Sequence, residues 1–201
     1  MSFKNAIALT GGIASGKSSV CSLLQMYGFK IIDADKVAHL ILDMQVDKIS
    51  TIFGKEYIKK KKVDRKKLGS LIFANKLERL KLEALLHPLI KEEIQKQASF
   101  CESKNVPYIV DIPLFFENKN YDIAEIVMVY CTKEQQLQRL VDRENLSKKE
   151  ATDRISSQMS IDDKKSLSTF VIDNKKDLKH LQNEVENFVE YIRKKYPNIK
   201  I

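Results

Sequence analysis

Cysteine is scarce in this chain. Cys21, Cys101 and Cys131 are the only three, and they are widely spaced. An odd number at such spacing indicates neither a disulfide framework nor a zinc site. All three lie in apolar surroundings, so we expect them to be small core residues.

Long hydrophobic runs are missing as well. No segment approaches the roughly 18 apolar residues that a membrane-spanning helix needs. The first apolar run begins close to Met1 and leaves no room for a signal peptide, so we expect a cytoplasmic protein without a membrane partner. The 201 residues, 43% of them hydrophobic and 31% charged, are typical of one sizeable globular domain.

Acidic residues are in the minority, with 27 against 35 basic ones, and the net charge of +8 suits a polyanionic ligand. The densest basic cluster is Lys59–Lys62, closely followed by Arg65, Lys66 and Lys67. No aromatic side chain is interleaved after Tyr57, and no nucleic-acid module is recognisable. We therefore expect a solvated loop here and no nucleic-acid partner. No obligate protein partner is evident either.

Glycine is also rare, yet three of the six glycines stand together in Gly11–Ser18, which fits G-x-x-x-x-G-K-[ST]. The apolar run Ala6–Leu9 precedes this segment, and the apolar-periodic stretch Val20–Tyr27 follows it. Strand, loop and helix in this order predict a phosphate-binding loop. A glycine-rich turn that merely caps a helix is the alternative.

The loop's residue types suit a nucleoside triphosphate. The glycines let successive N–H groups point into one hollow, at which the next helix aims its positive end. Lys17 is expected to reach the outer phosphates, and the Ser18 hydroxyl to ligate Mg²⁺. The residues expected to bind the nucleotide are Gly12, Ile13, Ala14, Ser15, Gly16, Lys17, Ser18 and Ser19.

Five near-continuous apolar segments predict buried strands of a parallel sheet. They are Ala6–Thr10, Phe29–Asp33, Tyr108–Ile112, Ile126–Cys131 and Phe170–Ile172. Helical patterns alternate with them at Ser18–Tyr27, Lys133–Arg143, Lys148–Met159 and Leu178–Lys194. This alternation predicts a doubly wound α/β core, made of residues 1–35, 105–138 and 167–201.

Two helical insertions interrupt the predicted core. Residues 36–104 contain the patterns Arg65–Asn75, Leu77–Leu86 and Pro88–Ser103, and this part of the chain could cover a second substrate. Pro88 fits the first position of a helix. Residues 139–166 are polar and rich in both signs of charge, which suits a lid over the phosphates.

Carboxylates follow two predicted strands at the sheet edge where ligands gather. We expect Asp35 to be the base that accepts a proton from an attacking hydroxyl, with Asp33 supporting it or the metal. Capping of the next helix is the alternative for either residue. Asp111 is expected at the magnesium site, unless it is a buried carboxylate bonded to nearby backbone.

Arg139 and Arg143 lie four residues apart on one predicted helix, where their guanidinium groups could neutralise a transferring phosphoryl group. An exposed basic face is the alternative. Glu117 is either a substrate contact or a surface charge. For His87 alone, a cap or a packed residue is the default.

The assembled segments resemble the dephospho-coenzyme A kinase family over nearly the whole chain. The His87-Pro88 and Pro113-Leu114-Phe115-Phe116-Glu117 segments, in this order and spacing, make the resemblance specific. The other matching pieces are 9–18, 32–35, 85–90, 136–140 with Arg143, Arg154 with Gln158, and 171–174.

This resemblance implies a P-loop NTPase-type fold and transfer of the ATP γ-phosphate to the ribose 3′-hydroxyl of dephospho-coenzyme A. It implies that Asp35 is the base, that Arg139 and Arg143 are lid arginines, and that Asn174 lies where the adenine is held. We assign His87, Pro113, Leu114 and Glu117 to the acceptor substrate on the same ground.

The sequence departs from the family at two places. Ala14 stands where the family usually has glycine, which we expect to be tolerated only with a negative φ. Ser168-Thr169 replaces a common Ala-Asp. A kinase of another small hydroxyl compound, such as a nucleoside or nucleotide, remains an alternative. A nucleotide switch is disfavoured because Asp173-Asn174-Lys175-Lys176 does not match the guanine signature Asn-Lys-x-Asp.

Overall fold

The computed structural model describes residues 3–118 and 121–197, which fall into two compact units. One unit consists of Met1–Ile32 together with Ala98–Ile201, and the other of Asp33–Gln97. No helix in the described ranges is both long enough and apolar enough to cross a membrane. The substrate-covering role expected of 36–104 and the lid role expected of 139–166 stay predictions.

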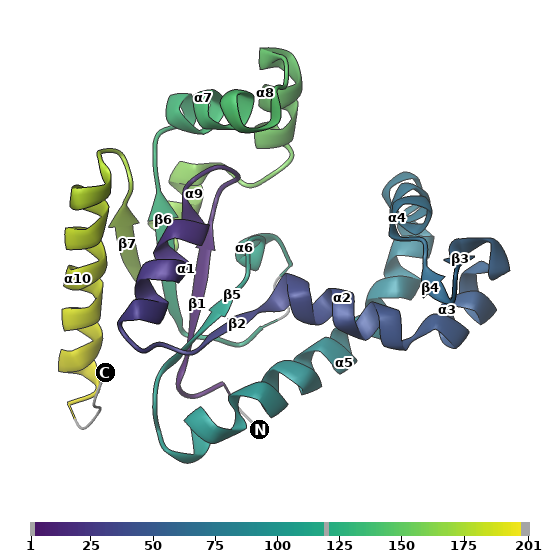
Figure 1. Ribbon diagram of the computed structural model, residues 1–201, viewed down its shortest axis with the longest axis horizontal. Helices are drawn as coiled ribbons and strands as arrows, with labels where there is room; N and C mark the ends of the chain where they lie inside the picture. The colour runs from purple at the N-terminus through teal and green to yellow at the C-terminus, as the bar shows by residue number, and fades with distance from the viewer. Residues whose placement is uncertain (1–2, 119–120, 198–201) are drawn as a thin grey trace. The chain divides into compact units, whose positions relative to one another are not determined.

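A five-stranded sheet is the centre of the first unit (Figure 1). Its strands lie in the order β2-β5-β1-β6-β7, and the pairs β1–β5, β1–β6 and β6–β7 are parallel. The strands are β1 (Ala6–Gly11), β2 (Ile31–Asp33), β5 (Tyr108–Asp111), β6 (Glu125–Tyr130) and β7 (Phe170–Asp173). All five predicted strands are confirmed, with ends that differ by one or two residues.

The register of the sheet brings strand ends together. Leu9 of β1 lies opposite both Asp111 of β5 and Val127 of β6. The segments that follow β1 and β5 therefore leave the sheet at neighbouring points of one edge. This is the edge at which parallel α/β sheets bind their ligands.

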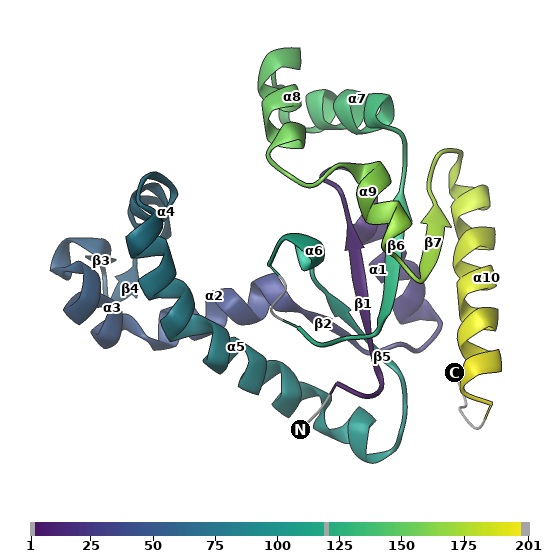
Figure 2. The same cartoon turned by 180° about the vertical axis from the view of Figure 1, so that it is seen from behind.

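Two helices bury one face of this sheet, as Figures 1 and 2 show from opposite sides. They are α1 (Lys17–Met26) and α10 (Leu178–Lys195). Alternate strand residues, such as Ile7 and Leu9, pack with Val20 of α1 and Phe188 of α10 in one apolar cluster. Because burial of apolar area is the main favourable term in folding, this cluster fixes α1 against β1.

Glu125 ties α10 to the sheet through a buried carboxylate. It forms an ion pair with Lys195 and accepts hydrogen bonds of 2.8 Å from both Thr169 Oγ1 and Tyr191 Oη. Burial acts to raise the pKa of this carboxyl group, but the hydrogen bonds from Lys195, Thr169 and Tyr191 together lower it.

Three helices follow β6, namely α7 (Lys133–Glu144), α8 (Lys148–Ser156) and α9 (Ile161–Ser166). Capping boxes begin the first two, where Thr132 pairs with Gln135 and Ser147 with Glu150. Ile161 of α9 packs on Met128 and Cys131, on the opposite side of β6 from Val127. The short α6 (Phe115–Asn118) follows β5.

The second unit is mostly helical, as expected. It contains α2 (Ala34–Met44), α3 (Val46–Phe53), the 3₁₀ turn η1 (Lys55–Tyr57), strands β3 (Ile58–Lys59) and β4 (Lys62–Val63), and α4 (Arg65–Ala74). The long helix α5 (Lys76–Ser103) begins in this unit and ends in the first.

Pro88 does not begin a helix. It lies inside α5, where the sequence predicts two separate helices, so that expectation is wrong. An internal proline removes a hydrogen bond and costs about 3 kcal/mol. The apolar stripe of α5 continues past this exposed proline, with buried leucines and isoleucines at a spacing of four residues: Leu82, Leu86, Ile90 and Ile94. Burial of this stripe offsets the proline.

The lysine cluster is solvated, as expected, and lies on a short antiparallel hairpin. Its outer lysines end β3 and begin β4 of an antiparallel hairpin. Lys60 and Lys61 form the turn with φ of 50° and 61°, in the left-handed region where Asn-Gly is the usual choice. The four lysines of this hairpin are exposed.

Candidate phosphate-binding site

The loop between β1 and α1 leaves a group of backbone donors unpaired. Gly16 precedes α1 with φ of 95°, and no acidic residue lies in the first turn of that helix. Within the described ranges, the N–H groups of Gly16, Lys17 and Ser18 find no acceptor, and the buried Oγ of Ser15 has no hydrogen-bond partner. Unpaired donors at a helix N-terminus form an anion site.

Ala14 adopts φ of 59°, so the expectation of a negative φ is wrong. The left-handed region costs an L-residue roughly 1–2 kcal/mol because Cβ approaches the following carbonyl oxygen. The loop therefore keeps a glycine-like conformation without a glycine, and the surrounding contacts must hold it there.

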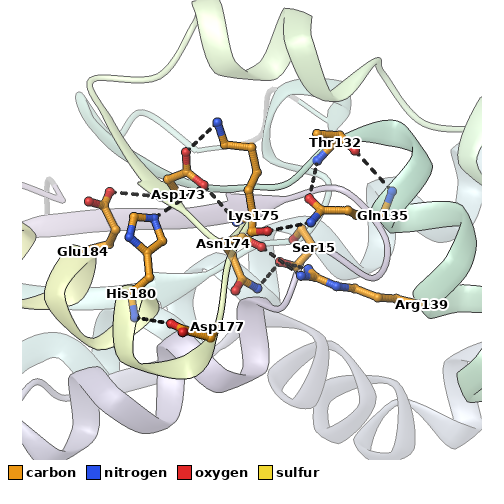
Figure 3. A network of polar contacts seen from close by, with 10 residues as sticks. All are labelled: Ser15, Thr132, Gln135, Arg139, Asp173, Asn174, Lys175, Asp177, His180 and Glu184. Carbon is orange, nitrogen blue, oxygen red and sulfur yellow. Dashed lines mark hydrogen bonds and ion pairs between the residues drawn. The ribbon is translucent and has the colours of Figure 1, made fainter.

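A network from two other segments holds the loop at Ser15 (Figure 3). The Ser15 carbonyl oxygen accepts a hydrogen bond of 2.8 Å from Asn174 Nδ2 and a longer one of 3.5 Å from Arg139 Nη1. Arg139 Nη2 in turn donates a hydrogen bond of 2.9 Å to the Asn174 carbonyl oxygen. A Cβ at Gly16 would lie 2.0 Å from Asn174 Nδ2, so this position requires glycine.

The loop is also held at Ile13 by two glutamines. Ile13 N donates to Gln158 Oε1 at 2.9 Å, and Ile13 O accepts from Gln136 Nε2 at 2.7 Å. Neither glutamine is among the residues that we predicted for the site.

Lys17 and Asp111 are brought together beside the loop. They form an ion pair in which both side chains are mostly buried, 16% and 12% exposed. The other Asp111 oxygen accepts from Cys21 Sγ at 3.5 Å. Cys21 is therefore more than the core residue that the sequence suggests, although it also packs against the main apolar cluster.

Asp33 ends β2 and caps α2. Its Oδ1 accepts from Lys36 N at 2.9 Å and its Oδ2 lies 3.3 Å from Lys36 Nζ, which agrees with the capping alternative. Asp35 lies in the first turn of α2. Both belong to the second unit, and their catalytic roles stay predictions.

The two predicted lid arginines have different partners. Arg139 lies against the loop network, whereas Arg143 Nη2 contacts Glu144 Oε1 at 2.5 Å. Glu144 also pairs with Arg154 through its other oxygen. The spacing of four residues on α7 thus places one arginine beside the phosphate loop and the other in a surface charge cluster.

Glu117 joins a buried charge pair, not predicted from the sequence. Its Oε1 lies 2.8 Å from the ammonium of Lys164, a residue that is completely buried. The same oxygen accepts a hydrogen bond of 3.1 Å from Met159 N. The Pro113 carbonyl accepts from Lys164 at 3.3 Å and from Thr10 Oγ1 at 3.1 Å. The segment after β5 is thereby fixed to β1 and α9.

The other residues expected to contact the substrate are spread over both units. Leu114 is 36% exposed in the first unit. His87 is half-buried inside α5, in the second unit.

A magnesium ion at this site has few protein ligands available. Residues 3–118 and 121–197 contain no group of three or more His, Cys, Asp or Glu side chains that could hold a metal. This fits Mg²⁺, which keeps several waters and binds through one or two carboxylates together with substrate phosphates. The exposed Ser18 next to the unpaired N–H groups suits that mode.

Sequence reasoning missed the side chains that hold the loop and its neighbours, chiefly Gln136, Gln158, Lys164 and Thr10. Both glutamines lie in segments that resemble the family, but neither residue type nor spacing indicates what an amide side chain contacts. For Lys164 the only sequence signal is weak: it lies three residues after Ile161 and three before Leu167, and so on the same helical face as both.

Known proteins resemble this chain over most of its length. A family model described as dephospho-CoA kinase matches residues 5–180. The chain belongs to the dephospho-CoA kinase family. The curated dephospho-CoA kinase of Sulfurimonas denitrificans is 50% identical over 196 residues, covering 98% of each chain. That of Helicobacter pylori strain 26695 is 42% identical over 193 residues, covering 94% of this chain and 98% of that protein.

Solved structures agree with the family. The dephospho-CoA kinase of Campylobacter jejuni is 35% identical, with a TM-score of 0.76 over 96% of this chain and 99% of that one. The Thermus thermophilus protein TT1252 is 27% identical, with a TM-score of 0.82 over 94% and 98%. A shikimate kinase of Acinetobacter baumannii, 14% identical with a TM-score of 0.54 over 98% and 96%, shares the fold. The predicted P-loop fold is confirmed.

Ala14→Gly should raise the free energy of unfolding by up to about 1 kcal/mol, because it removes the left-handed cost and adds a smaller entropic one. Ala84, exposed within α5, is the matched control. Ala84→Gly should destabilise by about 1 kcal/mol in urea titrations. A loss of the same size at both positions would contradict strain at Ala14.

Lys164→Met should lower the free energy of unfolding by about 3 kcal/mol, because it leaves the Glu117 carboxylate without its buried partner. The control is Lys81→Met at the exposed Lys81–Glu78 pair, which should change stability by less than about 0.5 kcal/mol. Chemical denaturation measures both. Equal midpoints for the two variants would show that the buried pair does not stabilise the fold.

Proposed function

We propose that this chain transfers the γ-phosphate of ATP to the ribose 3′-hydroxyl of dephospho-coenzyme A, giving coenzyme A and ADP. The observation that carries the proposal is the row of unpaired N–H groups at Gly16, Lys17 and Ser18, beside the Lys17–Asp111 pair, in a chain of the dephospho-CoA kinase family.

The phosphate loop binds and orients the triphosphate. The backbone donors and the positive end of α1 bind the phosphate oxygens. The Lys17 ammonium, which pairs with Asp111, also donates hydrogen bonds to the outer phosphates. Ser18, with Asp33 or Asp111 through water, would hold Mg²⁺, which when bound neutralises charge on the phosphates. Phosphoryl transfer of this kind depends mainly on position and on charge stabilisation.

Asp35 is the proposed base. As the 3′-oxygen forms its bond to the γ-phosphorus, the bond from that phosphorus to the ADP oxygen breaks, and the hydroxyl proton passes to an Asp35 oxygen. The carboxylate follows β2, an edge strand of the sheet that carries the loop.

Arg139 and Arg143 are the proposed charge-stabilising groups. Arg139 is already held next to the loop by the Ser15 and Asn174 carbonyls. Arg143 must leave Glu144 to contribute, and an exposed ion pair of this kind contributes little to stability. Exchange of that partner for a phosphoryl oxygen is therefore inexpensive.

The direct test is phosphorylation of dephospho-coenzyme A by the purified chain with Mg-ATP. We expect coenzyme A and ADP in equal amounts, with ADP release dependent on the acceptor. A panel of nucleosides and nucleotides is the control, and preference for one of these would overturn the proposed acceptor.

Asp35→Asn should lower kcat by about 10²–10³, by analogy with other groups that act in the transition state, while ATP affinity stays near that of the wild type. Steady-state kinetics and calorimetry measure the two effects. The matched control is Asp47→Asn in the first turn of α3, which should leave kcat unchanged. Full activity of Asp35→Asn would exclude this residue as the base.

A further inference from the structure

The peptide groups on either side of Ile13 are held by two amide side chains that come from far along the chain. Gln136 lies on α7 and is 2% exposed, whereas Gln158 is half-buried between α8 and α9. Gln158 accepts from the N–H of Ile13, and Gln136 donates to its carbonyl. Each glutamine thus uses the half of its amide that matches the backbone group it meets.

The loop is shaped around these amides. A Cβ at Gly12 would lie 2.3 Å from Gln136 Nε2 and 3.4 Å from Ile161 Cδ1, so only glycine leaves room for the side chain. The Ile13 carbonyl belongs to the peptide that precedes Ala14, whose left-handed φ sets the direction of the loop. Holding that carbonyl therefore opposes relaxation of Ala14 to a negative φ.

The two glutamines also lie at opposite ends of the segment formed by helices α7 and α8. Gln136 lies before most of α7 and α8, and Gln158 after them, so bonds from both sides of this segment meet on one residue of the phosphate loop. A displacement of α7 and α8 that broke either bond would free one side of the strained loop.

We propose that Gln136 and Gln158 are positioning residues that couple the α7–α8 segment to the geometry of the phosphate loop. With both bonds made, the loop is held with its N–H groups converging and its affinity for polyphosphate is high. With one bond lost, Ala14 relaxes and that affinity falls. The inference rests on the proposed function only for the identity of the nucleotide.

Methionine is the substitution that tests this, because it is close in size to glutamine and lacks the amide. Gln158→Met should weaken Mg-ATP binding about tenfold, as expected for loss of one orienting hydrogen bond. Gln136→Met should have an effect of the same direction. The control is Gln138→Met, also on α7, whose amide donates to Asp142 at 2.8 Å on the exposed face and which should bind ATP normally.

The double variant separates positioning from packing. Because both bonds hold one stretch of backbone, Gln136→Met with Gln158→Met should weaken ATP binding by clearly less than the product of the two single effects. Calorimetry with ATP and with ADP measures this, and thermal unfolding of each variant gives its stability alone.

Each outcome decides the proposal. Unchanged ATP affinity in Gln158→Met, or affinities of the single variants that multiply in the double variant, would overturn it, as would affinity losses that follow the thermal midpoint across all variants including Gln138→Met. If Gln136→Met fails to fold, Gln158→Met against its control still decides. Because ATP binding is measured without acceptor, a chain that binds ATP yet leaves dephospho-coenzyme A untouched would refute the proposed function and not this coupling.

Discussion

The unpaired N–H groups at the start of α1 are the feature on which the rest of the molecule depends. A loop free to relax would turn such groups toward nearby carbonyl oxygens. Here the loop instead keeps a left-handed Ala14 and a left-handed Gly16. The scaffold must therefore hold a conformation that the loop by itself would not favour.

The scaffold does this from several directions. The apolar cluster shared by β1, α1 and α10 fixes both ends of the loop, since the strand enters it and the helix leaves it. Amides of Gln136, Gln158 and Asn174 then hold individual backbone groups of the loop. Lys164, buried against Glu117, anchors α9 and thereby the segment that carries Gln158. Folding thus already places the backbone donors where they bind the phosphates, so the site is preorganised.

Much of the fold was predictable because its signals are local. Buried parallel strands are continuous apolar runs, and a phosphate loop needs glycine at Gly16, where a left-handed backbone meets Asn174. The prediction was wrong at Pro88, because proline's preference for the first turn of a helix is outweighed there by burial of the apolar stripe of α5. The hairpin at Lys60 and Lys61 was not predicted, because its turn contains neither glycine nor asparagine.

By itself the sequence determined the strand–loop–helix unit, the parallel sheet and the family, because residue type and short spacing carry that information. Tertiary structure decided which side chains meet the loop. Gln136 and Gln158 lie 123 and 145 residues from Ile13, and contacts over such separations depend on how helices pack, which no short pattern encodes. It also decided that Ala14 stays left-handed, since the contacts that hold this backbone come from those distant segments.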